Sequence, residues 1–148
     1  MTLIFMGAGI IVALDQLAKA LIRRSLLPGQ SLPIWPGIFH LSYVQNPGAA
    51  FGMLRNQTGL LVVVTAVVVV AIVLYAGRLE PHMSLLRWAM ALVLGGAVGN
   101  LIDRLRFGYV VDFLDFRIWP VFNVADIAIV SGVGLLFIYL LRSEGKQF

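Results

Sequence analysis

Four long apolar stretches dominate the pattern of hydrophobic and polar positions along this chain. They run from Leu3 to Ile22, from Thr58 to Ala76, from about Met83 to Ile102 and from about Val121 to Leu141. A helix of about 20 residues crosses the hydrocarbon core of a membrane, so the pattern predicts four membrane-spanning helices. The second stretch contains no charged residue and is rich in valine, which is typical of a helix that faces lipid.

The connections between these stretches differ in length. The first, Arg23 to Gln57, is long and contains four prolines, whereas residues 77–83 and the tail after Leu141 are short. Within the long connection, Phe39 to Tyr43 alternates apolar and polar positions, which indicates a strand. We therefore expect a small β-sheet lying on the membrane surface.

Composition favours an integral membrane protein. Of the 148 residues, 60% are hydrophobic and 12% are charged, and the mean hydropathy is +0.94, which is more apolar than a soluble domain requires. This length accommodates one compact bundle, so residues 1–148 are expected to form one domain. The absence of cysteine excludes disulfides, thiolate nucleophiles and cysteine metal ligands. No basic region precedes the first stretch, so we expect it to remain in the mature protein.

The net charge of +4 comes from basic residues at the ends of the apolar stretches, not from a stripe interleaved with aromatic residues. This distribution favours contact with anionic lipid head groups and excludes a nucleic-acid interface. The density of basic residues in the short tail and second connection favours cytoplasmic termini. The raw count is higher in the long loops on the other side, and it favours the opposite orientation.

Two aspartates, Asp112 and Asp126, lie in or beside apolar segments. A carboxylate at membrane depth costs about 3 kcal/mol, so a pair of them suggests acid–base chemistry at a membrane surface. Each has an alternative interpretation. Asp112 can be a solvated loop residue, and Asp126 can be the acid of a first helical turn that follows an Asn123 N-cap. Asp115 is expected to be a solvated loop carboxylate.

Asp15 and Lys19 lie one helical turn apart in the first stretch and can form an ion pair. We expect this pair at the helix end, with the Lys19 side chain extending to the interface. A Ser–Lys catalytic pair is the alternative, but no serine of the sequence lies in a supporting motif. His40 and His82 lie in different loops without further ligands, so no metal site is expected.

The third stretch contains two adjacent stripes of small and polar residues, each with a spacing of four residues. One consists of Gly95, Gly99 and Asp103, and the other of Gly96, Asn100 and Arg104. Glycines at this spacing allow close helix packing in lipid, which accounts for the glycines. The three polar side chains exceed what a helix cap requires, and they favour a supporting role around a site.

Five segments resemble the signatures of the lipoprotein signal peptidase family, also called signal peptidase II, in the order of that family. They are Asp15-Gln-Leu-Ala-Lys19, Asn46-Pro-Gly-Ala-Ala-Phe-Gly52, Gly95 to Arg104, Val110-Val-Asp112-Phe and Phe122-Asn123-Val-Ala-Asp126. The resemblance covers nearly the whole chain. It implies an all-α membrane fold of four transmembrane helices with a small extracytoplasmic β-sheet and a short interfacial helix.

The resemblance also implies an activity. Members of this family are aspartic endopeptidases of the bacterial inner membrane that act near its outer surface. They remove the signal peptide from prolipoproteins, cutting just before a cysteine that carries a diacylglyceryl group. By the resemblance, Asp112 and Asp126 are the catalytic dyad, without a metal or other cofactor, in a chain expected to be monomeric. The residues that would support the dyad or the substrate are Asn46, Gly52, Asn100, Asp103, Arg104, Asn123, Asp15 and Lys19.

Two carboxyls held close together share a proton, so one can activate water while the other supports the scissile carbonyl. The sequence does not assign these roles, because a coupled pair titrates as a unit. Two other classes stay open at this level: a proton-coupled transporter that uses membrane aspartates as a relay, and a non-catalytic assembly protein that binds partners through its glycine face. Carboxylates near segment ends and the lack of an internal repeat favour the peptidase.

Overall fold

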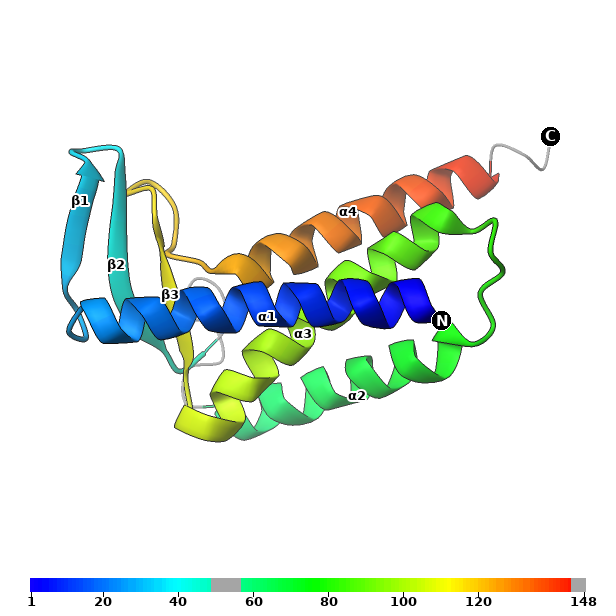
Figure 1. Ribbon diagram of the computed structural model, residues 1–148, viewed down its shortest axis with the longest axis horizontal. Coiled ribbons are helices and arrows are strands. Elements are labelled where there is room, and N and C mark those ends of the chain that lie inside the picture. The colour runs from blue at the N-terminus through cyan, green and yellow to red at the C-terminus, as the bar shows by residue number, and fades with distance from the viewer. Residues whose placement is uncertain (49–56, 145–148) are drawn as a thin grey trace.

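The computed structural model describes residues 1–48 and 57–144, which form four helices and a three-stranded sheet (Figure 1). In chain order they are α1 (Thr2–Ser25), β1 (Ser31–Trp35), β2 (Phe39–Asn46), α2 (Thr58–Ala76), α3 (Ser84–Phe107), β3 (Val110–Asp115) and α4 (Val124–Glu144). The sheet lies at one end of the helices. The N-terminus of α1 and the last turn of α4 lie at the opposite end.

All four helices are long and apolar enough to cross a membrane, which confirms the four predicted spans. The bounds of α2 agree with the prediction, whereas α1 and α3 continue past it through Ser25 and Phe107. Hydropathy locates the ends of the segment that can lie in lipid, but a helix continues until a residue adopts a non-helical backbone conformation. In α3 this happens at Gly108, whose φ of 77° lies in the left-handed region that glycine adopts readily.

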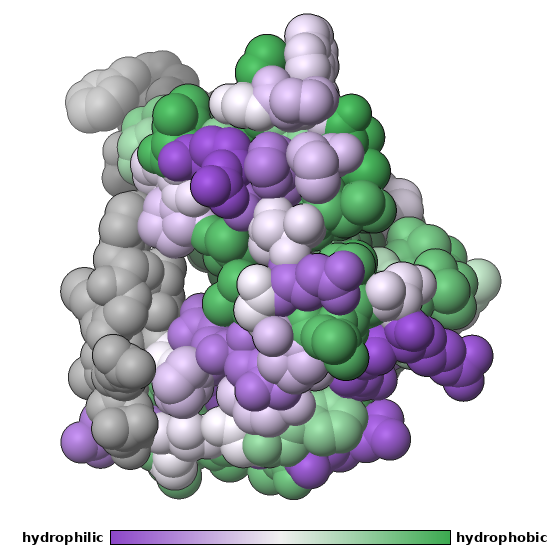
Figure 2. Space-filling model, turned by 90° about the vertical axis from the view of Figure 1, so that its left-hand side faces the viewer, coloured by the Kyte–Doolittle hydropathy of each residue, from purple (hydrophilic) through white to green (hydrophobic). Residues whose placement is uncertain are grey.

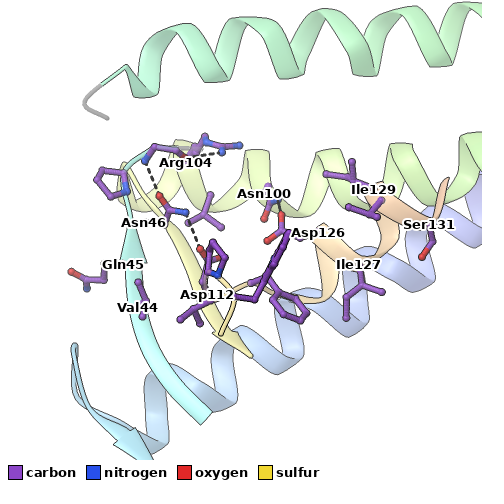
Figure 3. Close-up of a pocket in the computed structure, with 18 residues that line it drawn as sticks. Val44, Gln45, Asn46, Asn100, Arg104, Asp112, Asp126, Ile127, Ile129 and Ser131 are labelled. Carbon is purple, nitrogen blue, oxygen red and sulfur yellow. Dashed lines mark hydrogen bonds between the residues drawn. The ribbon is translucent and has the colours of Figure 1, made fainter. Parts of the chain in front are cut away.

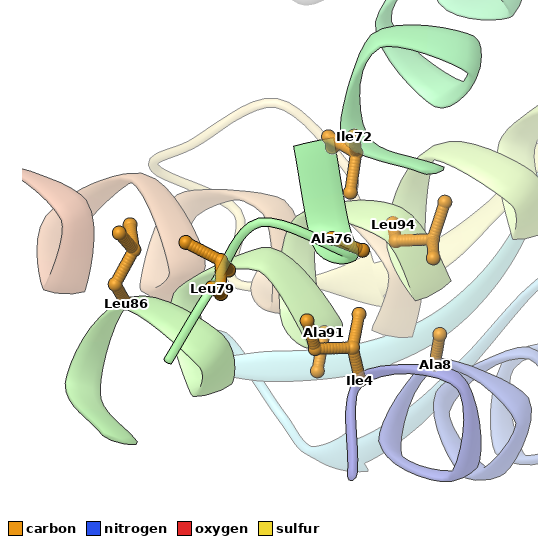
Figure 4. Packing of buried hydrophobic residues seen from close by; sticks show 8 residues of the cluster. All are labelled: Ile4, Ala8, Ile72, Ala76, Leu79, Leu86, Ala91 and Leu94. Carbon is orange, nitrogen blue, oxygen red and sulfur yellow. The ribbon is translucent and has the colours of Figure 1, made fainter. Parts of the chain in front are cut away.

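Helix α3 packs against the other three helices and forms the centre of the bundle. Its glycines allow this, as predicted. A Cβ atom at Gly95 would lie 2.6 Å from the Cβ of Ile11, and one at Gly96 would overlap the carbonyl oxygen of Ala125. The apolar core at the end away from the sheet joins α1, α2 and α3 (Figure 4). It contains Ile4, Ala8, Ile72, Ala76, Leu79, Leu86, Ala91 and Leu94.

The sheet is antiparallel in the order β1-β2-β3. The strand predicted at 39–43 is present and continues to Asn46. Strand β1 was not predicted because it contains Pro33, which is tolerated here at the edge of the sheet. The apolar segment around Asp112 forms β3, so it belongs to this sheet and not to a membrane span. Seen from the sheet side, hydrophilic residues are interspersed with hydrophobic ones (Figure 2).

Candidate active site

A cavity of about 810 Å³ lies where the sheet meets α3 and the first turns of α4 (Figure 3). Its polar lining includes Asn46 from β2, Asn100 and Arg104 from α3, Asp112 from β3 and Asp126 from α4. The structure thus brings together predicted site residues that are distributed over 80 positions of sequence. Much of the remaining wall is apolar and includes Val121, Phe122, Ile127, Ile129 and Val130.

Asp112 reaches the cavity through the pairing of β2 with β3. Asn46 pairs with Val110 and Val44 pairs with Asp112, so Asn46 and Asp112 lie diagonally on the same face of the sheet. The Asn46 Nδ2 donates a hydrogen bond of 2.9 Å to Asp112 Oδ2. The Asn46 Oδ1 accepts one of 3.0 Å from the backbone N–H of Gly48, which fixes the orientation of the amide.

Asp126 reaches the same cavity because the chain folds back after β3. The backbone N–H of Leu114 donates to the carbonyl of Phe122 at 2.8 Å, and the N–H of Phe122 donates to Leu114 at 3.2 Å. Helix α4 then begins beside β3. Asn123 accepts a 2.9 Å bond from the backbone N–H of Asp126, and its own N–H donates to Asp126 Oδ2 at 3.2 Å. This reciprocal arrangement is a capping box, so the N-cap that the sequence offered as an alternative interpretation is present.

Asn123 is fully buried and makes further contacts besides those of the helix cap. Its Nδ2 also donates a 2.7 Å bond to Asp112 Oδ1. The neighbouring Asn100 donates a 2.8 Å bond from its Nδ2 to Asp126 Oδ1. Together with Asn46, three asparagines therefore orient the two carboxylates, and Asn123 contacts both of them.

The electrostatic environment of Asp112 favours a bound proton. This side chain is 2% exposed, and burial, followed by the negative charge of Asp126, raises its pKa to about 7. Hydrogen bonds from Asn46 and Asn123 and the charge of Lys19 act in the opposite direction. With a pKa of about 7, Asp112 is protonated in a large fraction of molecules near neutral pH.

The structure corrects the prediction for Lys19. Its side chain does not extend to the interface but is completely buried, as is that of Asp15. The Lys19 Nζ lies 2.8 Å from Asp15 Oδ2 and 3.1 Å from Asp103 Oδ2. A buried ammonium is tolerated only when it is paired, and the partner that sequence spacing could not reveal is Asp103, far along the chain in α3.

The prediction for Asp115 was also wrong, since this carboxyl is buried rather than solvated. It accepts bonds from Ser42 Oγ at 2.7 Å and from the Arg117 backbone N–H and Nη1, both at 2.9 Å. Burial raises the pKa of Asp115, but these bonds outweigh it and hold the pKa below its usual value. They stabilise the turn in which Arg117 has a φ of 67°. Within the described residues, Asp115 does not line the cavity.

One polar residue was missed as a site candidate. The Gln16 Nε2 lies 3.2 Å from Asp15 Oδ2, 3.1 Å from the Gly99 carbonyl and 3.0 Å from Asp103 Oδ1. Its position beside Asp15 in an apolar stretch was the available signal. The predicted Gly52 lies outside the described residues. Residues 1–48 and 57–144 contain no group of three or more His, Cys, Asp or Glu side chains that could hold a metal ion.

Comparisons with known proteins show which family this chain resembles in sequence and fold. The family described as Signal peptidase (SPase) II matches residues 7–142. A lipoprotein signal peptidase of Moorella thermoacetica is 56% identical over 138 residues, covering 93% of this chain and 92% of its own. One of Pelotomaculum thermopropionicum is 45% identical, covering 97% and 95%. A bacterial membrane enzyme solved by the in meso method at 2.3 Å resolution superposes with a TM-score of 0.92 at 30% identity, covering 100% of this chain and 93% of that one.

Proposed function

Because this chain belongs to the signal peptidase II family of membrane aspartic proteases, we propose that Asp112 and Asp126 are its catalytic dyad. The observation that carries this proposal is the convergence of the two carboxyls, from β3 and α4, on one cavity with Asn123 hydrogen-bonded to both. A solvated loop carboxylate or a simple helix cap would not need that arrangement.

The reaction follows from one proton shared by two carboxyls. The ionised carboxylate takes a proton from a water molecule, whose oxygen attacks the scissile carbonyl carbon. The protonated carboxyl donates to the carbonyl oxygen, and the intermediate collapses with transfer of a proton to the departing nitrogen. The C–N bond breaks to give a carboxylic acid and an amine. Asp112 is the more buried of the two, which favours it as the partner that initially holds the proton.

The substrate that fits this cavity is a prolipoprotein whose signal peptide ends at a cysteine carrying a diacylglyceryl group. The apolar wall formed by residues of α4 and the preceding loop suits the signal helix and the acyl chains. Arg104 and Asn100 supply N–H donors at the polar wall, where they can bind the carbonyl groups of an extended peptide. By the family motif, Gly52 is a further residue proposed to support the dyad or the substrate.

The enzyme would act as a single monomeric domain in the bacterial inner membrane. Its cavity lies at the sheet end, opposite the N-terminus and the last turn of α4 (Figure 1). Cytoplasmic termini therefore put the cavity near the outer membrane surface, where a lipid-anchored precursor is accessible. Membrane lipids would surround the four helices. No cofactor enters the proposed reaction.

The test is cleavage of a diacylglyceryl-modified prolipoprotein in detergent micelles, comparing the native protein with Asp112→Asn, Asp126→Asn and Asp115→Asn. Asparagine keeps the shape of the side chain but cannot exchange the proton. We expect the first two variants to lose at least 10³-fold in kcat, in the range of removing a principal catalytic group, while remaining folded. Asp115→Asn should still cleave, since within the described residues Asp115 does not line the cavity. Normal cleavage by all three variants would refute the dyad, and an inert native protein would favour the transporter alternative.

A further inference from the structure

Beneath the two aspartates lies a buried group of three charged residues, Asp15, Lys19 and Asp103, which we call the Lys19 cluster. All three side chains are completely buried, and Lys19 bridges the two carboxylates at 2.8 and 3.1 Å. Gln16 donates to both carboxylates from the side. Within the described part of the chain, the Lys19 cluster does not line the cavity, so its residues are not placed to contact substrate.

The two carboxylates of the Lys19 cluster hold the backbone beside the two aspartates of the dyad. Asp103 Oδ2 accepts a 2.9 Å bond from the N–H of Val111, the residue before Asp112. Asp15 Oδ1 accepts a 2.9 Å bond from the N–H of Ala125, the residue before Asp126. One bond fixes strand β3 and the other fixes the start of α4. A single ammonium thus connects the two elements that carry the dyad.

A third connection runs through Asn100. Its Oδ1 accepts a 3.0 Å bond from Lys19 Nζ and a 3.1 Å bond from Asn123 Nδ2. With two donors on its oxygen, the Asn100 amide must direct its N–H groups the other way, and Nδ2 donates to Asp126 Oδ1 at 2.8 Å. Lys19 therefore also determines which end of this amide faces the dyad. Figure 3 shows Asn100 beside Asp126.

We propose that Lys19 is the positioning residue that sets the separation and relative orientation of Asp112 and Asp126. This role rests on the proposed dyad. Without the ammonium, the carboxylates of Asp15 and Asp103 repel each other, and β3 and α4 lose their common attachment. Small displacements of reacting groups cost about 100-fold in rate, so the effect falls on the chemical step, whereas substrate binding in the cavity is largely retained.

The test compares Lys19→Met, which keeps the apolar stem, with the double variant Lys19→Met/Asp15→Asn. The double variant retains the net charge of the Lys19 cluster, because it removes one cation and one carboxylate together. Arg24→Met is the matched control, since Arg24 is an exposed cation near the end of the same helix. For each purified, folded protein, kcat, KM, the pH profile and the thermal unfolding temperature are measured with the diacylglyceryl-modified substrate.

We expect kcat to fall about 100-fold in both Lys19 variants, with KM changed by less than about threefold, and the control to behave as the native protein. The pH profile distinguishes positioning from a purely structural role. The charged groups around Asp112 are Lys19 from α1, Arg104 and Asp103 from α3, and Asp126 from α4. Loss of the Lys19 charge alone should move the high-pH limb of the profile to higher pH.

A folded Lys19→Met protein with native kcat and an unchanged pH profile would overturn the proposal. If Lys19→Met does not fold, native kcat in the double variant overturns the proposal. Failure of both variants to fold also overturns it, because that result would indicate a stabilising role for Lys19. The dyad is judged separately. If Asp112→Asn and Asp126→Asn abolish cleavage while Lys19→Met does not, only the positioning role fails; if all three cleave normally, the dyad itself is wrong.

Discussion

Asn123 donates a 2.7 Å hydrogen bond to Asp112 from the position directly before α4. The same side chain caps that helix by accepting the backbone N–H of Asp126 at 2.9 Å. A residue that would otherwise be explained as an N-cap therefore also links the strand and the helix that carry the proposed dyad. The two roles use different atoms, Oδ1 for the cap and Nδ2 for Asp112, so they can be separated by substitution.

Asn123→Ser keeps an oxygen that can cap α4 but removes the N–H that reaches Asp112. We expect its unfolding temperature to stay near that of the native protein, while kcat falls by about 10- to 100-fold because Asp112 loses its orientation. Asn123→Ala removes both functions and should be less stable by about 1 kcal/mol, the usual effect of losing an N-cap. Thermal unfolding and cleavage measured on the same samples test this, and native kcat in the serine variant would contradict it.

Gly99 allows α1 to approach α3 at the level of the Lys19 cluster. A Cβ atom there would lie 2.7 Å from Asp15 Oδ2, so Gly99→Ala must displace the carboxylate that holds the N–H of Ala125. We expect a lower unfolding temperature and reduced kcat. Gly134→Ala is the control, because nothing lies within 4 Å of its added Cβ. Alanine is favoured over glycine in a helix by up to about 1 kcal/mol, so this variant should be unchanged or more stable.

The spans could be predicted from the sequence because lipid imposes a simple requirement on 20 or so consecutive residues. The three-stranded sheet could be predicted only in part. The alternation at 39–43 indicated β2, but β1 contains a proline and β3 is apolar on both faces, with five of its six residues buried. A strand covered on both sides shows no alternation, so the segment around Asp112 was not recognised as one.

The candidate site shows the same limit. The family motifs predicted a set of site residues, but not how Asp112 and Asp126 meet. Their meeting depends on the pairing of Leu114 with Phe122. The burial of Lys19 depends on Asp103, 84 positions later in the chain. Contacts between distant segments arise from tertiary packing, so they cannot be predicted from the spacing of residues along one helix. The local cap at Asn123, by contrast, was among the interpretations that the sequence offered, and the structure contains it.

The raised pKa of Asp112 predicts the pH dependence of activity. Above about pH 7 Asp112 loses its proton, so kcat should decline as the pH rises through that value. The hydrogen bond from Asn46 lowers the pKa of Asp112, and Asn46→Ala should therefore move this limb of the profile to higher pH. The measurement is kcat between pH 5 and 9 for both proteins. A profile that is flat through pH 7, or an opposite displacement in the variant, would contradict the prediction.

The same pKa has a consequence for stability. Folding raises the pKa of Asp112 from 3.8 to about 7, so the folded state favours the protonated form. The stability that this protonation contributes is complete below about pH 4 and is lost as the pH rises to about 7. Asp112→Asn stays neutral throughout. Its unfolding temperature, relative to that of the native protein, should increase between pH 4 and 7 and level off above; a difference independent of pH would contradict this.

Arg104 should affect substrate binding more than chemistry. Its guanidinium lines the cavity and donates a 3.3 Å bond to the Gly48 carbonyl, which leaves further N–H groups for a peptide backbone. We expect Arg104→Gln to raise KM by about 10-fold, the equivalent of about 1.4 kcal/mol of binding, with a smaller change in kcat. Arg106→Gln is the matched control, because Arg106 is exposed two residues further along α3 and, within the described residues, does not line the cavity. Equal effects of the two substitutions would show that only the positive charge at this end of the helix matters, and that Arg104 has no specific contact with the substrate.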